Sequence, residues 1–133
     1  MSSSRLIYVD ASALLKLVVD EPESAVLRSS LEGEAMVISA LGTVEVRRAV
    51  RRTGRDQALA RAEQVLTHVE LVALSDEVLD RAAMLEPAVL RTLDAIHVAT
   101  AIELGDQVAE VVTYDRRMVD AARLAGLSTS SPA

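Results

Sequence analysis

Short apolar runs alternate along the chain with longer stretches in which apolar residues recur every three or four positions. A short apolar run is typical of a strand buried on both faces, whereas the longer spacing indicates a helix with one buried face. The runs predict strands over residues 6–10, 35–39, 70–74 and 110–114, and we expect a fifth short strand near the C-terminal end.

Helices are expected between these strands, and turn-forming residues mark several of their ends. Pro22 and Gly33 delimit one helix, Gly54 separates two others, and Ser12 and Ser75 are candidate N-terminal caps. The predicted helices cover residues 11–19, 22–33, 43–53, 55–68, 76–86, 92–104 and 116–126. This alternation predicts an α/β fold in which helices cover both faces of a parallel sheet of four to five strands. Such sheets bind ligands at the carboxyl ends of their strands.

Length and composition exclude several classes of protein. The 133 residues suffice for one domain, which we assign to residues 1–133. No uncharged run approaches the roughly 18 residues of a membrane span, and the N-terminal segment lacks the features of a secretory signal, so we expect a cytoplasmic protein. Cysteine is absent and there are only two histidines, which excludes thiolate nucleophiles and histidine-rich zinc sites. Any catalysis must rest mainly on carboxylates, hydroxyls and arginine.

The charge and aromatic content restrict contact with nucleic acid to local sites. A net charge of −6 opposes nonspecific coating of a polyanion, and two Tyr without Phe or Trp cannot form a base-stacking platform. Thirteen of the 14 basic residues are Arg, which favours bidentate contacts to phosphate.

Four acidic residues stand in apolar surroundings, where an unpaired carboxylate costs several kcal/mol, roughly, to bury. Asp10 and Asp115 fall at the ends of predicted strands, and Glu45 and Asp94 lie near the starts of predicted helices. Clustered carboxylates repel one another unless a hard divalent cation such as Mg²⁺ or Mn²⁺ neutralises them. A cation there would lower the pKa of a bound water and stabilise a reacting phosphate, which permits phosphodiester hydrolysis without His or Cys.

Each acid also has a simpler explanation. Asp10 and Asp115 could cap the helices that follow them. Asp94 could be a cap or pair with Arg91, and Glu45 could pair with Arg48 three residues further along its helix. What favours a metal site is the occurrence of all four acids together in apolar segments, two of them at the expected end of the sheet.

Several neighbouring residues have two interpretations each. The hydroxyl of Ser12 could orient a metal-bound water or cap a helix, and His97 is better interpreted as a hydrogen-bonded packing histidine than as a general base. Arg48 and Arg52 share a helix face with Glu45, and Arg116 follows Asp115 directly. These arginines could contact RNA phosphates or simply form a solvated face.

The segment LLKLVV at residues 14–19 is apolar on almost every side of its helix. This is more apolar surface than a small domain needs to face its core, so we interpret it as a partner surface. The pattern fits either a homodimer interface or a groove that accepts a partner helix.

Four local strings occur in a specific order: LIYVDASALLKL, TVEVRRA, RTLDAIHVATAIEL and VVTYDRRMVDAARLAGL. In this respect the chain resembles VapC-type PIN domains, the toxins of VapBC toxin–antitoxin pairs, over nearly its whole length. The resemblance implies a PIN-like three-layer α/β/α sandwich in which Asp10, Glu45, Asp94 and Asp115 hold one or two Mg²⁺ or Mn²⁺ ions in an RNA-cleaving site. It also implies a homodimer inhibited by a VapB-type antitoxin. Some relatives place a polar or acidic residue where this chain has Thr113, which we interpret as a residue that supports the ligands.

The leading hypothesis is therefore a metal-dependent endoribonuclease toxin that hydrolyses RNA with a metal-activated water. The alternatives are a catalytically inactive PIN fold that binds an antitoxin and a Mg²⁺-dependent phosphatase. A phosphatase would use Asp10 as phosphoryl acceptor, but the second Asp expected two residues on is Ser12 here.

Overall fold

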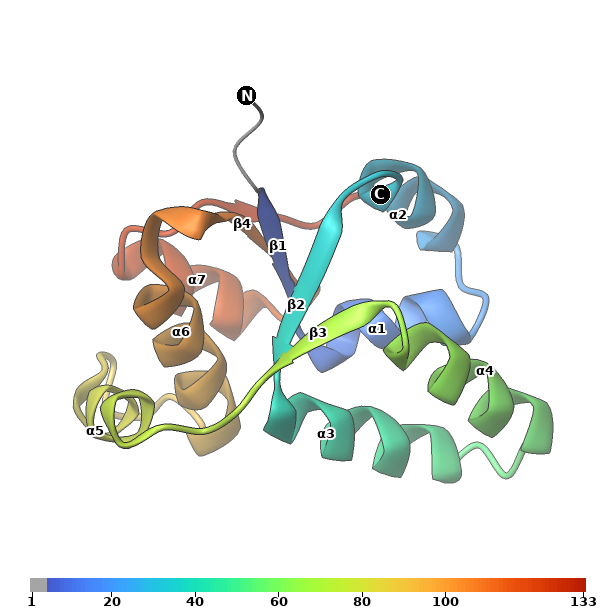
Figure 1. Cartoon of the computed structure of the whole chain (residues 1–133), viewed down its shortest axis with the longest axis horizontal. Helices are drawn as coiled ribbons and strands as arrows, with labels where there is room; N and C mark the ends of the chain where they lie inside the picture. Colours follow the sequence, from blue (N-terminus) through green and yellow to red (C-terminus); the bar gives the residue numbers. More distant parts are fainter. Residues whose placement is uncertain (1–4) are drawn as a thin grey trace.

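The computed structural model describes residues 5–133, which form a five-stranded sheet in the order β3-β2-β1-β4-β5 (Figure 1). Every pair of neighbouring strands is parallel. The prediction of an α/β fold with a parallel sheet of four to five strands is thus confirmed. The strands are β1 (Leu6–Val9), β2 (Ala35–Ser39), β3 (Val69–Val72), β4 (Val108–Val112) and β5 (Thr129–Ser130).

Seven α-helices cover the two faces of this sheet, which gives the three layers seen in Figure 1. On one side α1 packs against α2, α3 and α4, and on the other side α6 packs against α5 and α7. The helices are α1 (Ala11–Val18), α2 (Ser24–Leu31), α3 (Ala40–Arg51), α4 (Asp56–Leu66), α5 (Asp76–Met84), α6 (Thr92–Leu104) and α7 (Arg116–Leu124), and a short 3₁₀ helix spans Gly105–Gln107. No helix within residues 5–133 has both the length and the apolar composition that a bilayer crossing requires.

The core lies between the sheet and its helices, because the central strands present large side chains to both layers. Ile7 and Tyr8 on β1 and Ile38 on β2 are fully buried. Helix α6 is buried over residues 95–101, which explains why its sequence is apolar on nearly every side. All strands run in one direction, so their carboxyl ends meet at a single edge, next to the start of α3 in Figure 1.

The apolar surface of α1 is largely accounted for within the chain itself. Leu14 and Val18 are buried, and Leu15 and Leu17 are partly buried against the core. Helix α1 contacts three other helices of the same layer, and these contacts use the apolar residues that suggested a partner surface. The sequence pattern therefore reflects a helix packed on several sides rather than one packed only on the sheet.

The ends of some elements differ from the predictions, and capping explains two of the differences. Asp10, not Ser12, caps α1, because its carboxylate accepts the Ala13 N–H. Helix α3 begins at Ala40, three residues earlier than predicted, because Ser39 caps it by accepting the Leu41 N–H. The predicted cap at Ser75 is confirmed.

Candidate active site

The four predicted acids lie at the carboxyl edge of the sheet, on four different segments. Asp10 follows β1 directly, and Asp115 lies between β4 and α7. Asp94 stands in the first turn of α6, and Glu45 lies in the middle of α3. Segments that are distant in sequence therefore place one acid each at this edge.

Asp10 is almost fully buried, and both of its carboxylate oxygens accept hydrogen bonds. Its Oδ1 accepts the Ser12 hydroxyl at 2.6 Å and the Ala13 N–H at 3.0 Å, and its Oδ2 accepts the Thr113 hydroxyl at 2.5 Å. Burial raises the pKa of Asp10 above its usual value, and these three donors partly oppose that effect. Hydrogen bonds to both carboxylate oxygens thus hold Asp10 in one orientation.

Thr113 and Ser12 connect the ends of β1 and β4. Besides donating to Asp10, the Thr113 hydroxyl accepts the Asp115 N–H at 3.1 Å. The Ser12 hydroxyl accepts the Tyr114 N–H at 2.9 Å. The two hydroxyls thereby couple the orientation of Asp10 to the backbone that carries Asp115.

Asp94 has a different environment, because its buried oxygen lacks a hydrogen bond. Asp94 Oδ2 is the one buried side-chain oxygen or nitrogen within residues 5–133 that has no hydrogen-bond partner. Burial, and then the charge of Asp115, raise the pKa of Asp94, and Asp10 adds to the increase. The nearest cation is the exposed guanidinium of Arg91, with Nε 3.8 Å from Asp94 Oδ2 and another nitrogen 3.8 Å from Asp115 Oδ2. Arg91 therefore bridges the two carboxylates without a hydrogen bond to either.

Glu45 is held by a buried histidine. His97 Nε2 lies 2.5 Å from Glu45 Oε1, and His97 Nδ1 lies 2.6 Å from the Tyr8 hydroxyl. The Tyr8 hydroxyl in turn accepts the Ser39 N–H at 3.0 Å. Burial raises the pKa of Tyr8 far above its usual range, so the phenol remains protonated. The histidine is hydrogen-bonded and packed as expected, and it contacts a predicted ligand directly.

The simpler explanations hold for some of the acids. Asp10 and Asp115 are both helix caps, since each accepts a backbone N–H of the following helix. The Arg91–Asp94 ion pair is present, at 3.8 Å. The predicted pair of Glu45 with Arg48 does not form, because Glu45 contacts His97 instead. Capping does not compete with metal binding, because a carboxylate has lone pairs beyond the one a cap uses.

The edge does not form a complete metal cage as it stands. Across residues 5–133, no three His or acidic side chains converge closely enough to hold a metal ion. The oxygen-only donors nevertheless suit Mg²⁺ or Mn²⁺, which prefer carboxylates. The unbonded, buried Asp94 Oδ2, next to the charges of Asp115 and Asp10, is what such a cation would neutralise. The residues present therefore fit a hard divalent cation.

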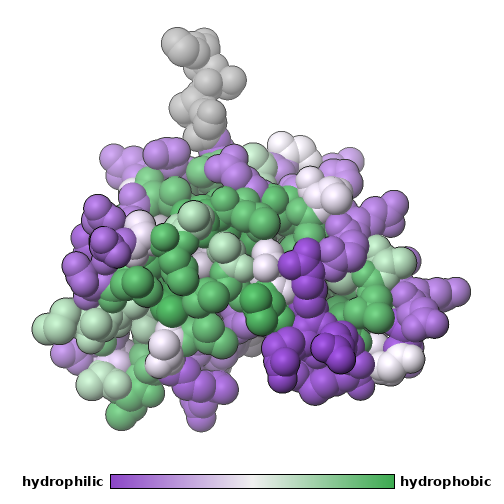
Figure 2. All heavy atoms as spheres, turned by 60° about the horizontal axis from the view of Figure 1, so that its bottom comes forward, coloured by the Kyte–Doolittle hydropathy of each residue, from purple (hydrophilic) through white to green (hydrophobic). Residues whose placement is uncertain are grey.

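Several arginines lie on the segments that carry the acids, at the C-terminal end of α3 and directly after Asp115. Arg48, Arg52 and Arg116 are exposed, and the structure of residues 5–133 gives none of them an ion pair. Arg48, Arg51 and Arg52 line a surface hollow of about 310 Å³, whereas Arg47 is paired with Glu63 at 2.8 Å. Figure 2 turns the carboxyl edge forward and shows apolar residues over much of this face, with hydrophilic groups beside them.

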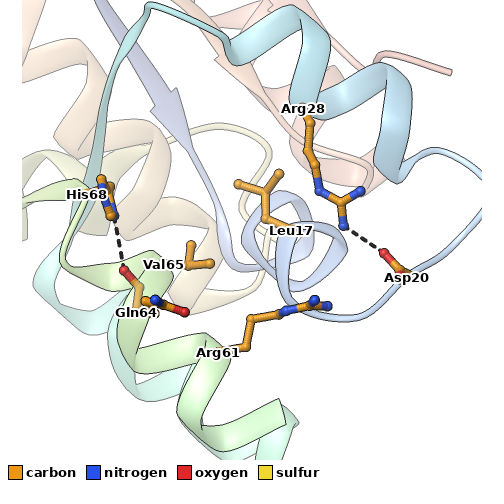
Figure 3. A pocket seen from close by; sticks show the side chains of 7 residues that line it. All are labelled: Leu17, Asp20, Arg28, Arg61, Gln64, Val65 and His68. Carbon is orange, nitrogen blue, oxygen red and sulfur yellow. Dashed lines mark hydrogen bonds and ion pairs between the residues drawn. The ribbon is translucent and has the colours of Figure 1, made fainter. Parts of the chain in front are cut away.

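Another hollow lies away from the acids, between α1, α2 and α4 (Figure 3). It has a volume of about 410 Å³, and its charged groups are already engaged. Arg28 pairs with Asp20 at 2.7 Å, and His68 bonds the Gln64 carbonyl oxygen at 3.1 Å. None of the predicted site residues lines this hollow.

Sequence reasoning missed two parts of the site. Tyr8 looked like an ordinary core residue, because nothing in a strand sequence shows which buried hydroxyl meets which helix. Arg91 was considered only as a partner of Asp94, and its second contact, to Asp115, depends on how α6 packs against α7. The position of His97 one turn after Asp94 was the available signal for its proximity to the acids.

Known proteins resemble this chain in sequence. Residues 7–124 match the family model of the PIN domain. The chain is 45% identical over 127 residues to Ribonuclease VapC46 of Mycobacterium tuberculosis (strain ATCC 25618 / H37Rv), covering 95% of this chain and 97% of the relative. It is 39% identical over 132 residues to Ribonuclease VapC47 of Mycobacterium tuberculosis (strain CDC 1551 / Oshkosh), covering 96% and 97%.

The fold also recurs in solved structures. The crystal structure of VapBC2 from Rickettsia felis, bound to a DNA fragment from their promoter, superposes with a TM-score of 0.77. The match covers 96% of this chain and 99% of that one at 14% sequence identity. At this identity the similarity concerns the fold alone.

Proposed function

This chain belongs to the PIN-domain family and, within it, resembles the VapC ribonucleases over almost its full length, and on that premise we propose that it is a divalent-metal-dependent endoribonuclease toxin. The predicted membership of the VapC-type PIN family is confirmed by these matches. The observation that carries the metal-dependent part of the proposal is the buried, unbonded Asp94 Oδ2 beside two further carboxylates.

Asp10, Glu45, Asp94 and Asp115 would hold the Mg²⁺ or Mn²⁺ ion. Such a cation, when bound, supplies Lewis acidity that lowers the pKa of water and stabilises the charge that develops on a phosphate. The proposed reaction is hydrolysis of an RNA phosphodiester bond by water. In this proposal the four carboxylates also repel the RNA backbone until their charge is neutralised, which makes RNA binding at the edge depend on the cation.

The other residues at the edge have supporting roles in this proposal. Ser12 and Thr113 hold Asp10 in one orientation, so that little movement is needed when a cation binds. Arg48 and Arg52 are exposed at the C-terminal end of α3, the helix that carries Glu45, and the exposed Arg116 directly follows Asp115. In this proposal they would contact phosphates on either side of the scissile bond. These contacts position the RNA without reading its sequence.

We also propose an antitoxin of the VapB type and a second copy of the chain as partners. The support is that exposed apolar side chains occur on the elements around the acidic edge: Val44 on α3 is 50% exposed, Leu79 on α5 45% and Leu93 on α6 40%. Figure 2 shows apolar residues over much of this face, and a contiguous apolar patch is typical of a surface that proteins cover. The cytoplasmic location stays a prediction.

The proposal is tested by measuring RNA cleavage with Mn²⁺ supplied, using wild-type protein and Asp10→Asn. We expect the variant to lose at least about 100-fold in rate, because metal-ion stabilisation of a reacting phosphate is worth several kcal/mol. Asp106→Asn is the matched control, since Asp106 is an exposed acid before β4, at the opposite edge of the sheet. A folded Asp10→Asn protein that cleaves RNA as fast as wild type would count decisively against the proposal.

A catalytically inactive PIN module is the alternative, and metal binding distinguishes it from the enzyme. An inactive module would bind no Mn²⁺ through these acids in calorimetry, whereas the enzyme binds it. The phosphatase alternative gains no support from the geometry, because Ser12 holds Asp10 through its hydroxyl where a phosphatase would need a second Asp.

A further inference from the structure

We propose that His97, in the tautomer that Tyr8 imposes, is a positioning residue that fixes Glu45 for the divalent cation. The inference rests on the proposed function and deepens it, because it explains how a ligand on a mobile glutamate side chain acquires one orientation. It is carried by a continuous line of hydrogen bonds from the Ser39 N–H through Tyr8 and His97 to Glu45, of which the first two are buried and the last is partly buried.

The direction of each hydrogen bond follows from the donors available. The Ser39 N–H can only donate, so the Tyr8 hydroxyl accepts that bond, and the Glu45 carboxylate can only accept, so His97 Nε2 donates to it. In a neutral ring, the other nitrogen, Nδ1, accepts the Tyr8 hydroxyl proton. Nδ1 is then an acceptor and carries no proton, which leaves the ring proton on Nε2. That proton points to Glu45 Oε1, 2.5 Å away. The Tyr8 hydroxyl, which accepts the Ser39 N–H at the end of β2, therefore supports the tautomer in which His97 turns an N–H toward the acid.

The bond leaves one oxygen of Glu45 available. Within residues 5–133 the hydrogen bond from His97 engages Oε1 only, and Glu45 makes no other side-chain hydrogen bond. A glutamate on a helix has three rotatable bonds, and fixing one oxygen removes most of that freedom before a cation arrives. His97 itself cannot swing away, because it is 1% exposed.

Gly42 makes room for this contact. It lies one turn before Glu45 on α3, and a Cβ atom there would be 3.1 Å from His97 Cε1 and 2.2 Å from Ile38 Cδ1. Gly inside a helix costs roughly half to one kcal/mol relative to Ala in ordinary positions. At this position it lets α3 approach the imidazole closely enough for Glu45 to reach it.

The proposal differs from simple core packing in what it predicts for Tyr8. If His97 only filled space, the Tyr8 hydroxyl would be irrelevant to metal binding, since Phe fills nearly the same volume. If the line of hydrogen bonds positions Glu45, removal of that single oxygen atom must change both the tautomer of His97 and the affinity for the cation.

The first measurement is the ring nitrogen NMR spectrum of the metal-free protein. We expect wild-type His97 to show a protonated Nε2 and an unprotonated Nδ1, and Tyr8→Phe to show a mixture of tautomers. Only one other histidine, the exposed His68, contributes signals, and His97→Gln identifies which set belongs to His97. A wild-type His97 with its proton on Nδ1 would overturn the inference.

The second measurement is Mn²⁺ affinity by calorimetry. We expect His97→Leu and Tyr8→Phe each to weaken Mn²⁺ binding by about 10- to 100-fold, the usual effect of removing a group that orients a metal ligand. His97→Gln should recover much of the loss, because its amide can donate to Glu45 and accept from Tyr8. His68→Leu and Tyr114→Phe are matched controls, since the Tyr114 hydroxyl bonds the Pro132 carbonyl oxygen, not the acids.

The outcomes separate this inference from the proposed function. If wild-type protein binds no Mn²⁺, or Asp94→Asn binds it as well as wild type, the proposed function fails. If wild type binds Mn²⁺ and Asp94→Asn does not, but Tyr8→Phe and His97→Leu both keep wild-type affinity, only the positioning role is overturned. Should His97→Leu fail to fold, Tyr8→Phe decides alone, because it removes one atom and leaves the ring in place.

Discussion

Asp10 and Asp94 are two acids at the same edge of one sheet, and burial raises the pKa of both. Their surroundings are opposite. Asp10 receives three hydrogen bonds from its own chain, whereas Asp94 Oδ2 receives none and faces the charges of other carboxylates. A buried carboxylate that receives several hydrogen bonds is tolerated without a further partner, but the charge of one without donors is costly to bury unless a cation compensates it.

The comparison indicates a division of roles at the edge. Asp10 is the preorganised side of the site, because Ser12 and Thr113 fix it before anything binds. Asp94 Oδ2 has no hydrogen-bond donor within residues 5–133, so its charge is available to a bound cation.

The largest effect is expected for Asp94→Asn in RNA cleavage. The neutral amide removes a charged ligand, so the rate should fall at least about 100-fold, whether or not the protein is as stable as wild type. Cleavage is measured with Mn²⁺ at saturating concentration, and Asp106→Asn is again the control. Full activity of Asp94→Asn would show that its unbonded oxygen has no role in the reaction.

A smaller loss is expected for Thr113→Val, which keeps the shape of the side chain. The substitution removes the donor to Asp10 Oδ2 and the acceptor for the Asp115 N–H. Because a supporting group is lost rather than a ligand, activity should fall about 10- to 100-fold. The free energy of unfolding, measured with urea, should fall by about 1–3 kcal/mol, since a buried amide loses its partner. If Thr113→Val is less stable than wild type but cleaves RNA at the same rate, Thr113 has only a structural role.

In the metal-free protein, the substitutions Asp94→Asn and Asp10→Asn should change the melting temperature differently. A raised folded-state pKa means that the native protein holds the Asp94 proton more tightly than the unfolded chain does, so this acid lowers stability as pH rises. Asp94→Asn should therefore raise the melting temperature at pH 7 by a few degrees, roughly, and this gain should vanish below about pH 4.

Asp10→Asn should give no such gain at pH 7, because Asn has one acceptor oxygen in place of two and its NH2 group cannot accept, so the bonds from Ser12 and Thr113 cannot both be kept. Melting curves of both variants in the presence of a chelator check the difference. Equal stabilisation by the two substitutions would mean that the donors around Asp10 do not offset its burial.

The smallest effect is expected for Arg91→Ala. The guanidinium is 64% exposed and 3.8 Å from each carboxylate, so it competes only weakly with a divalent cation. An exposed pair is worth about 0.2–1 kcal/mol, and its removal should tighten Mn²⁺ binding by no more than about fivefold. Calorimetry at low salt measures the change, with Arg123→Ala as an exposed control on α7. Weaker Mn²⁺ binding by Arg91→Ala would contradict a competing role.

Much of the fold follows from local features of the sequence. The buried strands and the helix over residues 92–104 have patterns that one segment determines by itself, because hydrophobic periodicity and end signals are local. The start of α3 was misplaced by three residues because Ser39 serves at once as the end of a strand and as a helix cap. The four acids were identifiable since each is conspicuous in its own segment.

The contacts between segments could not be predicted from local sequence patterns. The line from Tyr8 to Glu45 joins β1, α6 and α3, and it depends on the distance between layers, which no single segment encodes. The apolar sides of α1 suggested a partner protein because the sequence does not show that three helices of the same chain cover them. Side-chain chemistry could be predicted, whereas the pairing of side chains required the packed structure.

The most direct test of a cation site at this edge is Mn²⁺ titration of the wild-type protein by calorimetry, with Asp94→Asn measured alongside. The proposed site predicts saturable binding by wild type that is lost or weakened at least 100-fold, roughly, in Asp94→Asn. Equal binding by the two proteins, or none by wild type, would contradict it.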